Sequence, residues 1–119
     1  MSLLAPVSIG ELIDKITILE IKKDKIKNPD ALQNIQKELT LLNTLNTWPE
    51  IKTHELYNVN LQIWGVEDEL RELEKVQKFG PEFIALARSV YILNDKRAHI
   101  KRDMNVRFNS NIIEEKSYQ

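Results

Sequence analysis

Two cations one helical turn apart offer the clearest opportunity for chemistry in this sequence. Arg97 and Lys101 are spaced so that both can reach the same carboxylate or phosphate. Arg97 also stands where the surrounding apolar pattern calls for another apolar side chain. We interpret the region as a candidate anion site, in which the Glu67 and Asn94 side chains orient the ligand. Its residues are Asn60, Glu67, Asn94, Arg97 and Lys101, with Arg88 and Tyr91 earlier on neighbouring faces of the same helix.

The proposed grouping depends on a tight turn between two helical segments. Phe79-Gly80-Pro81 ends one helix and begins another, and so short a loop forces the two helices to run antiparallel. Facing positions then sum to about 160 or 161. This register places Asn94 opposite Glu67, and Lys101 opposite Asn60.

A purely structural role for these polar residues is the main alternative. A charge at an apolar seam is tolerated when it is paired, and it then specifies helix register and partner choice. We favour this role over ligand binding, because ion-pair networks of structural origin also resemble functional sites. Replacement of Arg97 by Met distinguishes the two: a more stable protein with unchanged ligand behaviour indicates the structural role.

The sequence offers no apparatus for nucleophilic, redox or metal-dependent catalysis. It contains no Cys, no phosphate-binding glycine loop and no Gly-x-Ser-x-Gly turn. Asp95, His99 and Asp103 have a spacing that can bind a metal, but a solvated helix face is the more typical explanation. We therefore predict no catalytic residue, no metal and no cofactor.

Charge and hydropathy argue against nucleic acid and membranes as partners. The formal net charge is −1, and the basic run over residues 95–102 lacks interleaved aromatic residues. No stretch approaches the ~20 apolar residues of a membrane span, and the N-terminal residues lack a basic segment typical of a signal peptide. The expected location is the cytoplasm.

The elements that must position the candidate site are four helices. Ser8 and Glu11 match a capping box, and Asn28-Pro29 is typical of a helix boundary. The most regular pattern is a pair of seven-residue ladders, as in a coiled coil. One ladder contains Leu56, Ile63 and Leu70 with Val59, Val66 and Leu73, and the other contains Phe83, Val90, Arg97 and Met104 with Leu86, Leu93 and Ile100.

These patterns predict an all-α, antiparallel four-helix bundle-like domain that spans residues 1–119. The expected helices cover residues 8–27, 29–46, 53–78 and 81–108, so that the C-terminal hairpin is the longer. Residues 47–52 form a turn or a short helix. In the tail, residues 109–119, either Asn111 starts a short helix or Ile112 and Ile113 dock on the bundle.

Three segments, residues 8–22, 87–101 and 114–118, resemble a family of short, all-helical bacterial and phage-associated proteins. The family is classed only as a domain of unknown function, and the stretch Asn94-Asp-Lys-Arg-Ala98 is the most particular part of the likeness. The resemblance implies no activity. It directs the search for a site to Tyr91, Asn94, Arg97 and Lys101.

The first helix is also similar in pattern to that of all-helical chorismate mutases, which contain an Ile-Asp pair like Ile13-Asp14. Those enzymes hold a dianion between Arg and Lys side chains. Their first-helix arginine is missing here, because this segment contains only lysines. The resemblance implies an enzymatic alternative through architecture alone.

The sequence as a whole favours a non-catalytic protein that acts through association with another protein, most simply a second copy of itself. The longer hairpin outreaches the first two helices and leaves apolar surface that monomers seldom expose. The alternative functions are binding of a small anionic metabolite at the Glu67, Asn94, Arg97 and Lys101 cluster, or a chorismate-mutase-like reaction there.

Overall fold

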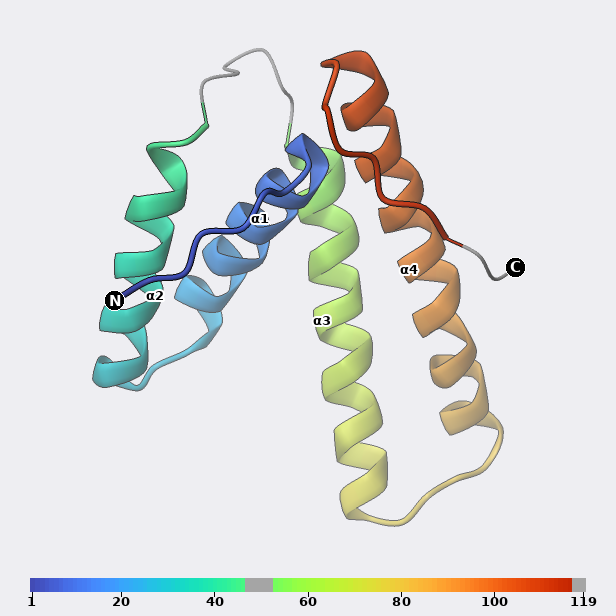
Figure 1. The fold of residues 1–119 in the computed structure, drawn as a ribbon. Coiled ribbons are helices and arrows are strands. Elements are labelled where there is room, and N and C mark those ends of the chain that lie inside the picture. Colours follow the sequence, from blue (N-terminus) through green and yellow to red (C-terminus); the bar gives the residue numbers. More distant parts are fainter. Residues whose placement is uncertain (47–52, 117–119) are drawn as a thin grey trace.

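The computed structural model describes residues 1–46 and 53–116 and contains four α-helices there, with no strand. Helices α3 and α4 run antiparallel as one hairpin, and α1 and α2 form another (Figure 1). The prediction of an all-α antiparallel bundle is confirmed, and so is the greater length of its C-terminal hairpin. The four helices are α1 (Ile9–Lys25), α2 (Pro29–Asn43), α3 (His54–Lys75) and α4 (Pro81–Arg107).

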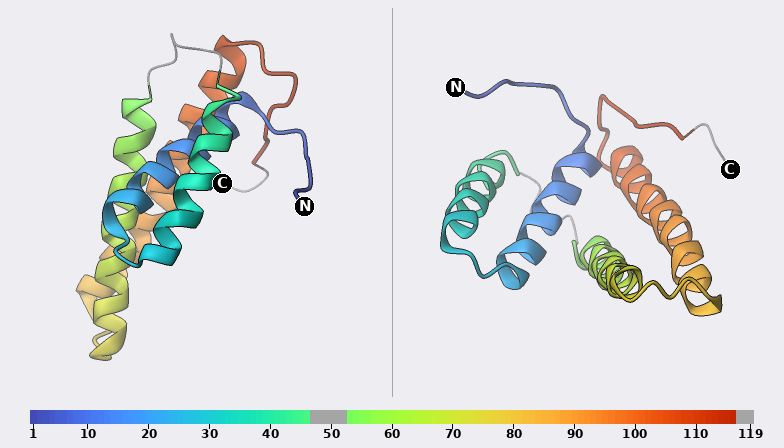
Figure 2. Two further views of the ribbon diagram at one scale, coloured as in Figure 1. Left: turned by 90° about the vertical axis from the view of Figure 1, so that its left-hand side faces the viewer. Right: turned by 90° about the horizontal axis from the view of Figure 1, so that it is seen from below.

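Helix α1 is the central element. It contacts α2 on one side and both α3 and α4 on the other, whereas α2 contacts no helix but α1 in the described part of the chain (Figure 2). The bundle therefore has two separate cores, which explains why α1 is apolar on more than one face. The core against α3 and α4 contains Ile9, Ile13, Leu56, Val59, Ile100 and Met104, and the core against α2 contains Leu12, Ile16, Leu19, Ile35 and Leu39.

The first two helices begin at the predicted caps. The Ser8 hydroxyl accepts the Glu11 backbone N–H at 3.1 Å, and the Asn28 side-chain oxygen accepts the Ala31 N–H at 3.0 Å. The second half of the predicted capping box is wrong, because the Glu11 carboxylate accepts a hydrogen bond from Lys101 instead.

Helices α1 and α2 end earlier than predicted. Helix α1 stops at Lys25, since Ile26 is extended and its side chain packs against the α1–α2 core. Helix α2 stops at Asn43, three residues before the predicted end. The expected turn or short helix over residues 47–52 lies outside the described residues.

Helix α3 starts at His54 rather than residue 53 and ends at Lys75, three residues before the predicted end. The reason for the early end is Gln77, whose φ of 55° is left-handed and cannot continue the helix. Helix α4 likewise stops at Arg107, one residue early, before a left-handed Asn109.

The two predicted ladders do face each other. Leu56 and Met104, which the register pairs, lie in the same buried cluster. The burial changes along the hairpin, however, because α1 lies against only the half nearer the Leu56 end (Figure 1). Toward the connecting loop the ladder residues are only half-buried, and these are Val66, Leu70, Leu73, Phe83, Leu86, Val90 and Leu93.

The described part of the C-terminal tail contains no helix. It returns along α4, and its Ser110 hydroxyl accepts the Ile9 backbone N–H at 3.1 Å. Glu115 pairs with Arg102 at 2.6 Å. The helical alternative for this segment is therefore wrong for the described residues. None of the helices formed by the described residues is both long enough and apolar enough to traverse a bilayer.

Candidate functional site

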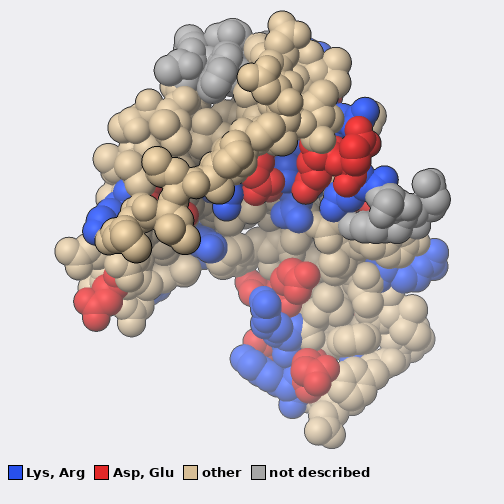
Figure 3. Space-filling view, in the orientation of Figure 1, with Lys and Arg blue, Asp and Glu red and all other residues tan. Residues whose placement is uncertain are grey.

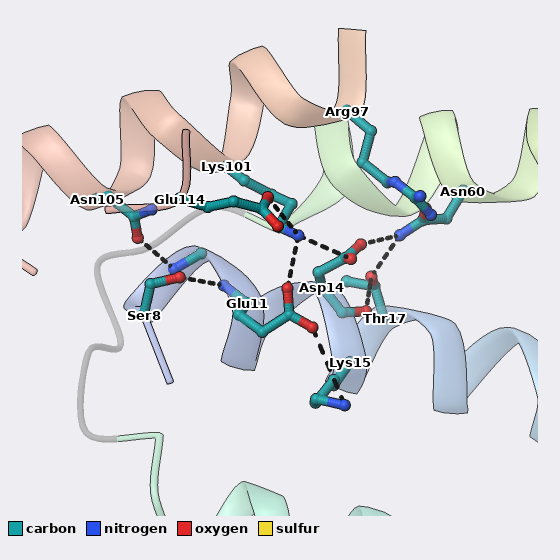
Figure 4. A network of polar contacts seen from close by, with 11 residues as sticks. Ser8, Glu11, Asp14, Lys15, Thr17, Asn60, Arg97, Lys101, Asn105 and Glu114 are labelled. Atoms are coloured by element: carbon teal, nitrogen blue, oxygen red, sulfur yellow. Dashed lines mark hydrogen bonds and ion pairs between the residues drawn. The ribbon is translucent and has the colours of Figure 1, made fainter. Parts of the chain in front are cut away.

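Lys101 is the centre of a charged network where α1 crosses α4. Its ammonium group donates to the Glu11 carboxylate at 2.6 Å and lies 3.5 Å from that of Asp14. A third carboxylate, Glu114 of the tail, is 3.6 Å away (Figure 4). The Lys101 side chain is 9% exposed, so that these partners replace the water it has lost. The result is one buried cation that connects α1, α4 and the tail.

Burial and charge act in opposite directions on the pKa of Lys101. Desolvation lowers it, but the hydrogen bond to Glu11 and the negative charges of Asp14, Glu11 and Glu114 outweigh the desolvation. The pKa is therefore raised above its ordinary 10.5, and Lys101 is cationic throughout the physiological range.

A second set of buried polar groups extends this network from α1 to α3. The Asn60 amide donates to Asp14 at 2.8 Å and to the Thr17 hydroxyl at 2.9 Å. Thr17 in turn donates to the Asp14 carbonyl at 2.8 Å. Asp14 therefore accepts from Asn60 with one carboxylate oxygen and faces Lys101 with the other.

The backbones of α1 and α4 approach each other closely at Gly10. A Cβ added there would lie 2.6 Å from the Lys101 carbonyl oxygen, which is backbone and cannot rotate aside as a flexible side chain would. The Gly10 N–H donates to the side-chain oxygen of Asn105 at 2.7 Å. This hydrogen bond satisfies one of the free donors at the start of α1. We call this region, residues 8–17, 56–60 and 97–105, the crossing.

The structure brings Asn60, Arg97 and Lys101 together, although not in the predicted pairing. Asp14 of α1 lies between Asn60 and Lys101, and the Asn60 side-chain oxygen instead accepts from Arg97 at 3.4 Å. The register estimate was wrong here because it considered only α3 and α4, while α1 inserts a side chain into the same seam.

Arg97 lies at the boundary of two cavities that differ in character. One is mainly apolar, has a volume of about 320 Å³, and lies between α1, α3 and α4. The other is mainly charged, with a volume of about 280 Å³ beside the Lys101 network. Figure 3 shows the surface hollowed between the α1–α2 pair and the α3–α4 hairpin, with acidic and basic groups around it. Ile18 and Arg97 line both cavities; the apolar one adds Ile21, Asn60, Ile63, Trp64, Glu67 and Arg71, and the charged one adds Glu11, Asp14, Asn94, Ala98, Lys101, Glu114 and Lys116.

The remaining predicted site residues are divided by this geometry. Glu67 and Asn94, which the register places opposite each other, line different cavities. Arg88 and Tyr91 are exposed, and their helical offset directs them away from the seam. The structure does not bring them to the Lys101 network, because residues 88 and 91 lie about half a turn and a third of a turn from Arg97 around α4.

No group of three or more His, Asp or Glu residues within 1–46 and 53–116 is arranged to hold a metal ion. The carboxylates of Glu11, Asp14 and Glu114 surround Lys101 instead. Their arrangement is suited to holding a cation of the protein itself.

Comparison with protein families decides the classification. Residues 4–119 match DUF6165, described as a family of unknown function. The chain belongs to this family. Neither a curated protein nor a solved structure matches the DUF6165 chain.

Several residues that form the crossing or the Lys101 network of this DUF6165 protein were not predicted as part of the site. They are Ser8 as a buried group, Gly10, Asp14, Thr17, Asn105 and Glu114. A signal for two of them was present: Asp14, Thr17, Ile18 and Ile21 share one face of α1 by spacing. The spacing of Ile18 and Ile21 thus indicates a further face of α1 that packs inward, and the preceding turn supplies Asp14 and Thr17 to that face. Nothing in the local sequence distinguishes Asn105.

Proposed function

We propose that this protein acts by associating with a second copy of itself through the distal hairpin, which we define as residues 66–93. One observation carries the proposal: this part of α3–α4 exposes large apolar side chains to solvent. Val76, Phe79, Ile84, Tyr91 and Ile92 are each more than half exposed. Ile84, Tyr91 and Ile92 also lie on one side of α4 by their spacing.

Charge supports a second copy as the occupant of this surface. Helix α3 contains six acidic and two basic side chains, and α4 contains three acidic and six basic ones. Among the described residues, no ion pair joins α3 to α4; the ion pairs of α4 are with α1, with the tail and within α4 itself. In a two-fold dimer, the acidic helix of each copy would face the basic helix of the other.

The test is the oligomeric state by light scattering and native mass spectrometry, over a roughly hundredfold range of concentration. We expect a concentration-dependent dimer. The double substitution Ile84→Glu and Ile92→Glu should yield a monomer, because it places charge in the apolar surface. The matched control is Leu41→Glu on α2, where the leucine is 58% exposed.

A wild-type protein that stays monomeric throughout overturns the proposal. So does a control variant that dissociates as completely as the double variant, since the interface would then not be the distal hairpin.

We infer a second function, binding of a small anion at Arg97. The specific observation is that the Arg97 guanidinium, with five N–H donors, makes one hydrogen bond, of 3.4 Å, to the part of the chain that the structure describes. Lys101, by contrast, already faces three carboxylates. The ligand is therefore assigned to Arg97 alone. A chorismate-mutase-like reaction would need a dianion held between Arg97 and Lys101, and this arrangement is disfavoured.

The anion site is tested by titration with acetate and inorganic phosphate, followed by the NMR signal of the Arg97 side chain. We expect saturable shifts that are lost in Arg97→Met and preserved in Arg88→Met, whose arginine is on the exposed side of the same helix. Equal shifts of the surface arginine signals overturn the assignment.

A further inference from the structure

We propose that the Arg97 site takes carboxylates with an apolar, preferably aromatic body; this rests on the anion site proposed above and names its ligand class. The apolar cavity holds the body, and Arg97 holds the carboxylate at the cavity's edge. Neither the charge pattern nor the helix register of the sequence predicts such a two-part ligand.

The apolar part of the site is built from two helices. Ile18 and Ile21 of α1 form one wall, and Ile63 and Trp64 of α3 form the opposite one. Ile21 is 1% exposed and Ile18 is half-buried, so this wall is part of the packed protein rather than a surface patch. A volume of about 320 Å³ is at the lower end of small-molecule pockets. Trp64 offers the large apolar face on which an aromatic ring packs favourably.

The polar part of the site is held in place by the crossing. Asn60 is 4% exposed and donates to Asp14 and Thr17, so its side-chain oxygen is fixed in orientation. That oxygen accepts from Arg97 at 3.4 Å and thereby orients the guanidinium where the two cavities meet. No carboxylate of the described residues is in an ion pair with Arg97, so that most of its donors can face a ligand.

The neighbouring charges favour a single carboxylate over a larger anion. Glu11, Asp14 and Glu114 line the charged cavity together with Lys101 and Lys116. Because the three carboxylates already surround Lys101, they would repel a second negative group placed beside it. The apolar cavity lacks these three carboxylates and contains Glu67 together with Arg71. A ligand whose one negative charge meets Arg97, and whose body extends toward Trp64, avoids the repulsion.

The test compares three probes on the wild-type protein by NMR titration and calorimetry. The probes are 3-phenylpropionate, its neutral analogue 3-phenylpropionamide, and acetate, each up to about 10 mM. We expect 3-phenylpropionate to bind at least about tenfold more tightly than either of the others, because only it uses both parts of the site. Amide signals of Ile18, Ile63 and Trp64 should shift, and those of Ile84 and Ile92 should not.

Two variants locate the interaction. Arg97→Met should weaken 3-phenylpropionate at least about tenfold while the protein stays folded, and Trp64→Leu should weaken it while leaving acetate unchanged. Arg88→Met is the matched control and should bind as the wild type does. Melting temperatures of all variants separate a lost contact from a lost fold.

The outcomes distinguish this inference from the function on which it rests. If acetate and 3-phenylpropionate bind equally and both depend on Arg97, the anion site stands and the ligand class is overturned. If no anion binds, both are overturned. If 3-phenylpropionamide binds as tightly as 3-phenylpropionate, the cavity is merely apolar and Arg97 has no part in recognition.

Discussion

The crossing and the distal hairpin are built on the same two ladders, yet they differ in burial and in polarity. At the crossing, Leu56 and Val59 are almost completely buried, and charged groups lie among them in a satisfied network. In the distal hairpin, the equivalent ladder residues Leu70 and Leu73 are half-buried and have no such network. The difference arises from α1, which covers one half of α3–α4. A heptad pattern thus indicates where two helices meet and does not indicate how well the seam is shielded from water.

The largest effect should come from truncating a ladder leucine inside the crossing. Leu56→Ala removes a side chain with no exposed surface, and we expect a loss of about 2–5 kcal/mol in the free energy of unfolding. Leu70→Ala, two heptads further along, should lose less than half as much because water already reaches that side chain. Urea denaturation of both variants measures the ratio. Equal losses at a concentration at which the protein is monomeric would mean that the distal seam is shielded from water even without the proposed second copy.

The next effect concerns the charge at the crossing. Lys101→Met should destabilise the protein by about 3 kcal/mol, because it leaves Asp14 and Glu11 without their cation in a buried place. The control is Lys96→Met, whose lysine is exposed and pairs with none of the groups described in the network. Chemical denaturation gives both values. Comparable losses in the two variants would contradict the central role of Lys101.

Two glycines provide a comparison of the backbone at the crossing with that of a free helix face. Gly10→Ala should cost about 1–3 kcal/mol, since its Cβ would press on the α4 backbone. Gly65→Ala has nothing within 4 Å of the added Cβ and should stabilise α3 by about 0.5–1 kcal/mol. Thermal unfolding of both variants should move in opposite directions. A neutral Gly10→Ala would show that the α1–α4 distance is adjustable.

The smallest effect is a pH dependence at the alkaline end. The pKa of Lys101 is raised in the folded protein, so its stabilising contribution is complete below its ordinary 10.5 and is lost as pH rises through the folded value. Between about pH 9 and 11.5, the wild type should therefore lose more stability than Lys101→Met, which lacks the titrating group. Urea midpoints of the two proteins across this range test the sign. Parallel curves would mean that the ammonium group is no better stabilised in the folded state than in the unfolded one.

Sequence reasoning succeeded where the cause was local or periodic. Ser8 and Asn28 were recognisable caps because a short polar side chain before an apolar run satisfies backbone donors close by. The end of α3 was not predicted from the sequence. Gln77 has a left-handed φ, and backbone hydrogen bonds end the helix there, but the residue type of glutamine does not indicate this conformation. The predicted site also includes Arg88 and Tyr91, although both are exposed and lie on other sides of α4 than Arg97.

By itself, the sequence determined the four helices, their antiparallel pairing and the polar character of Asn60, Arg97 and Lys101. These follow from residue spacing, which each helix expresses on its own. The partners of those side chains were decided only by tertiary structure, because Gly10 lets α1 approach α4 and brings Asp14 between Asn60 and Lys101. A third helix decides whether a polar residue neutralises a charged neighbour or faces an open cavity. The position at which that helix crosses the hairpin cannot be derived from the heptad pattern of α3 and α4.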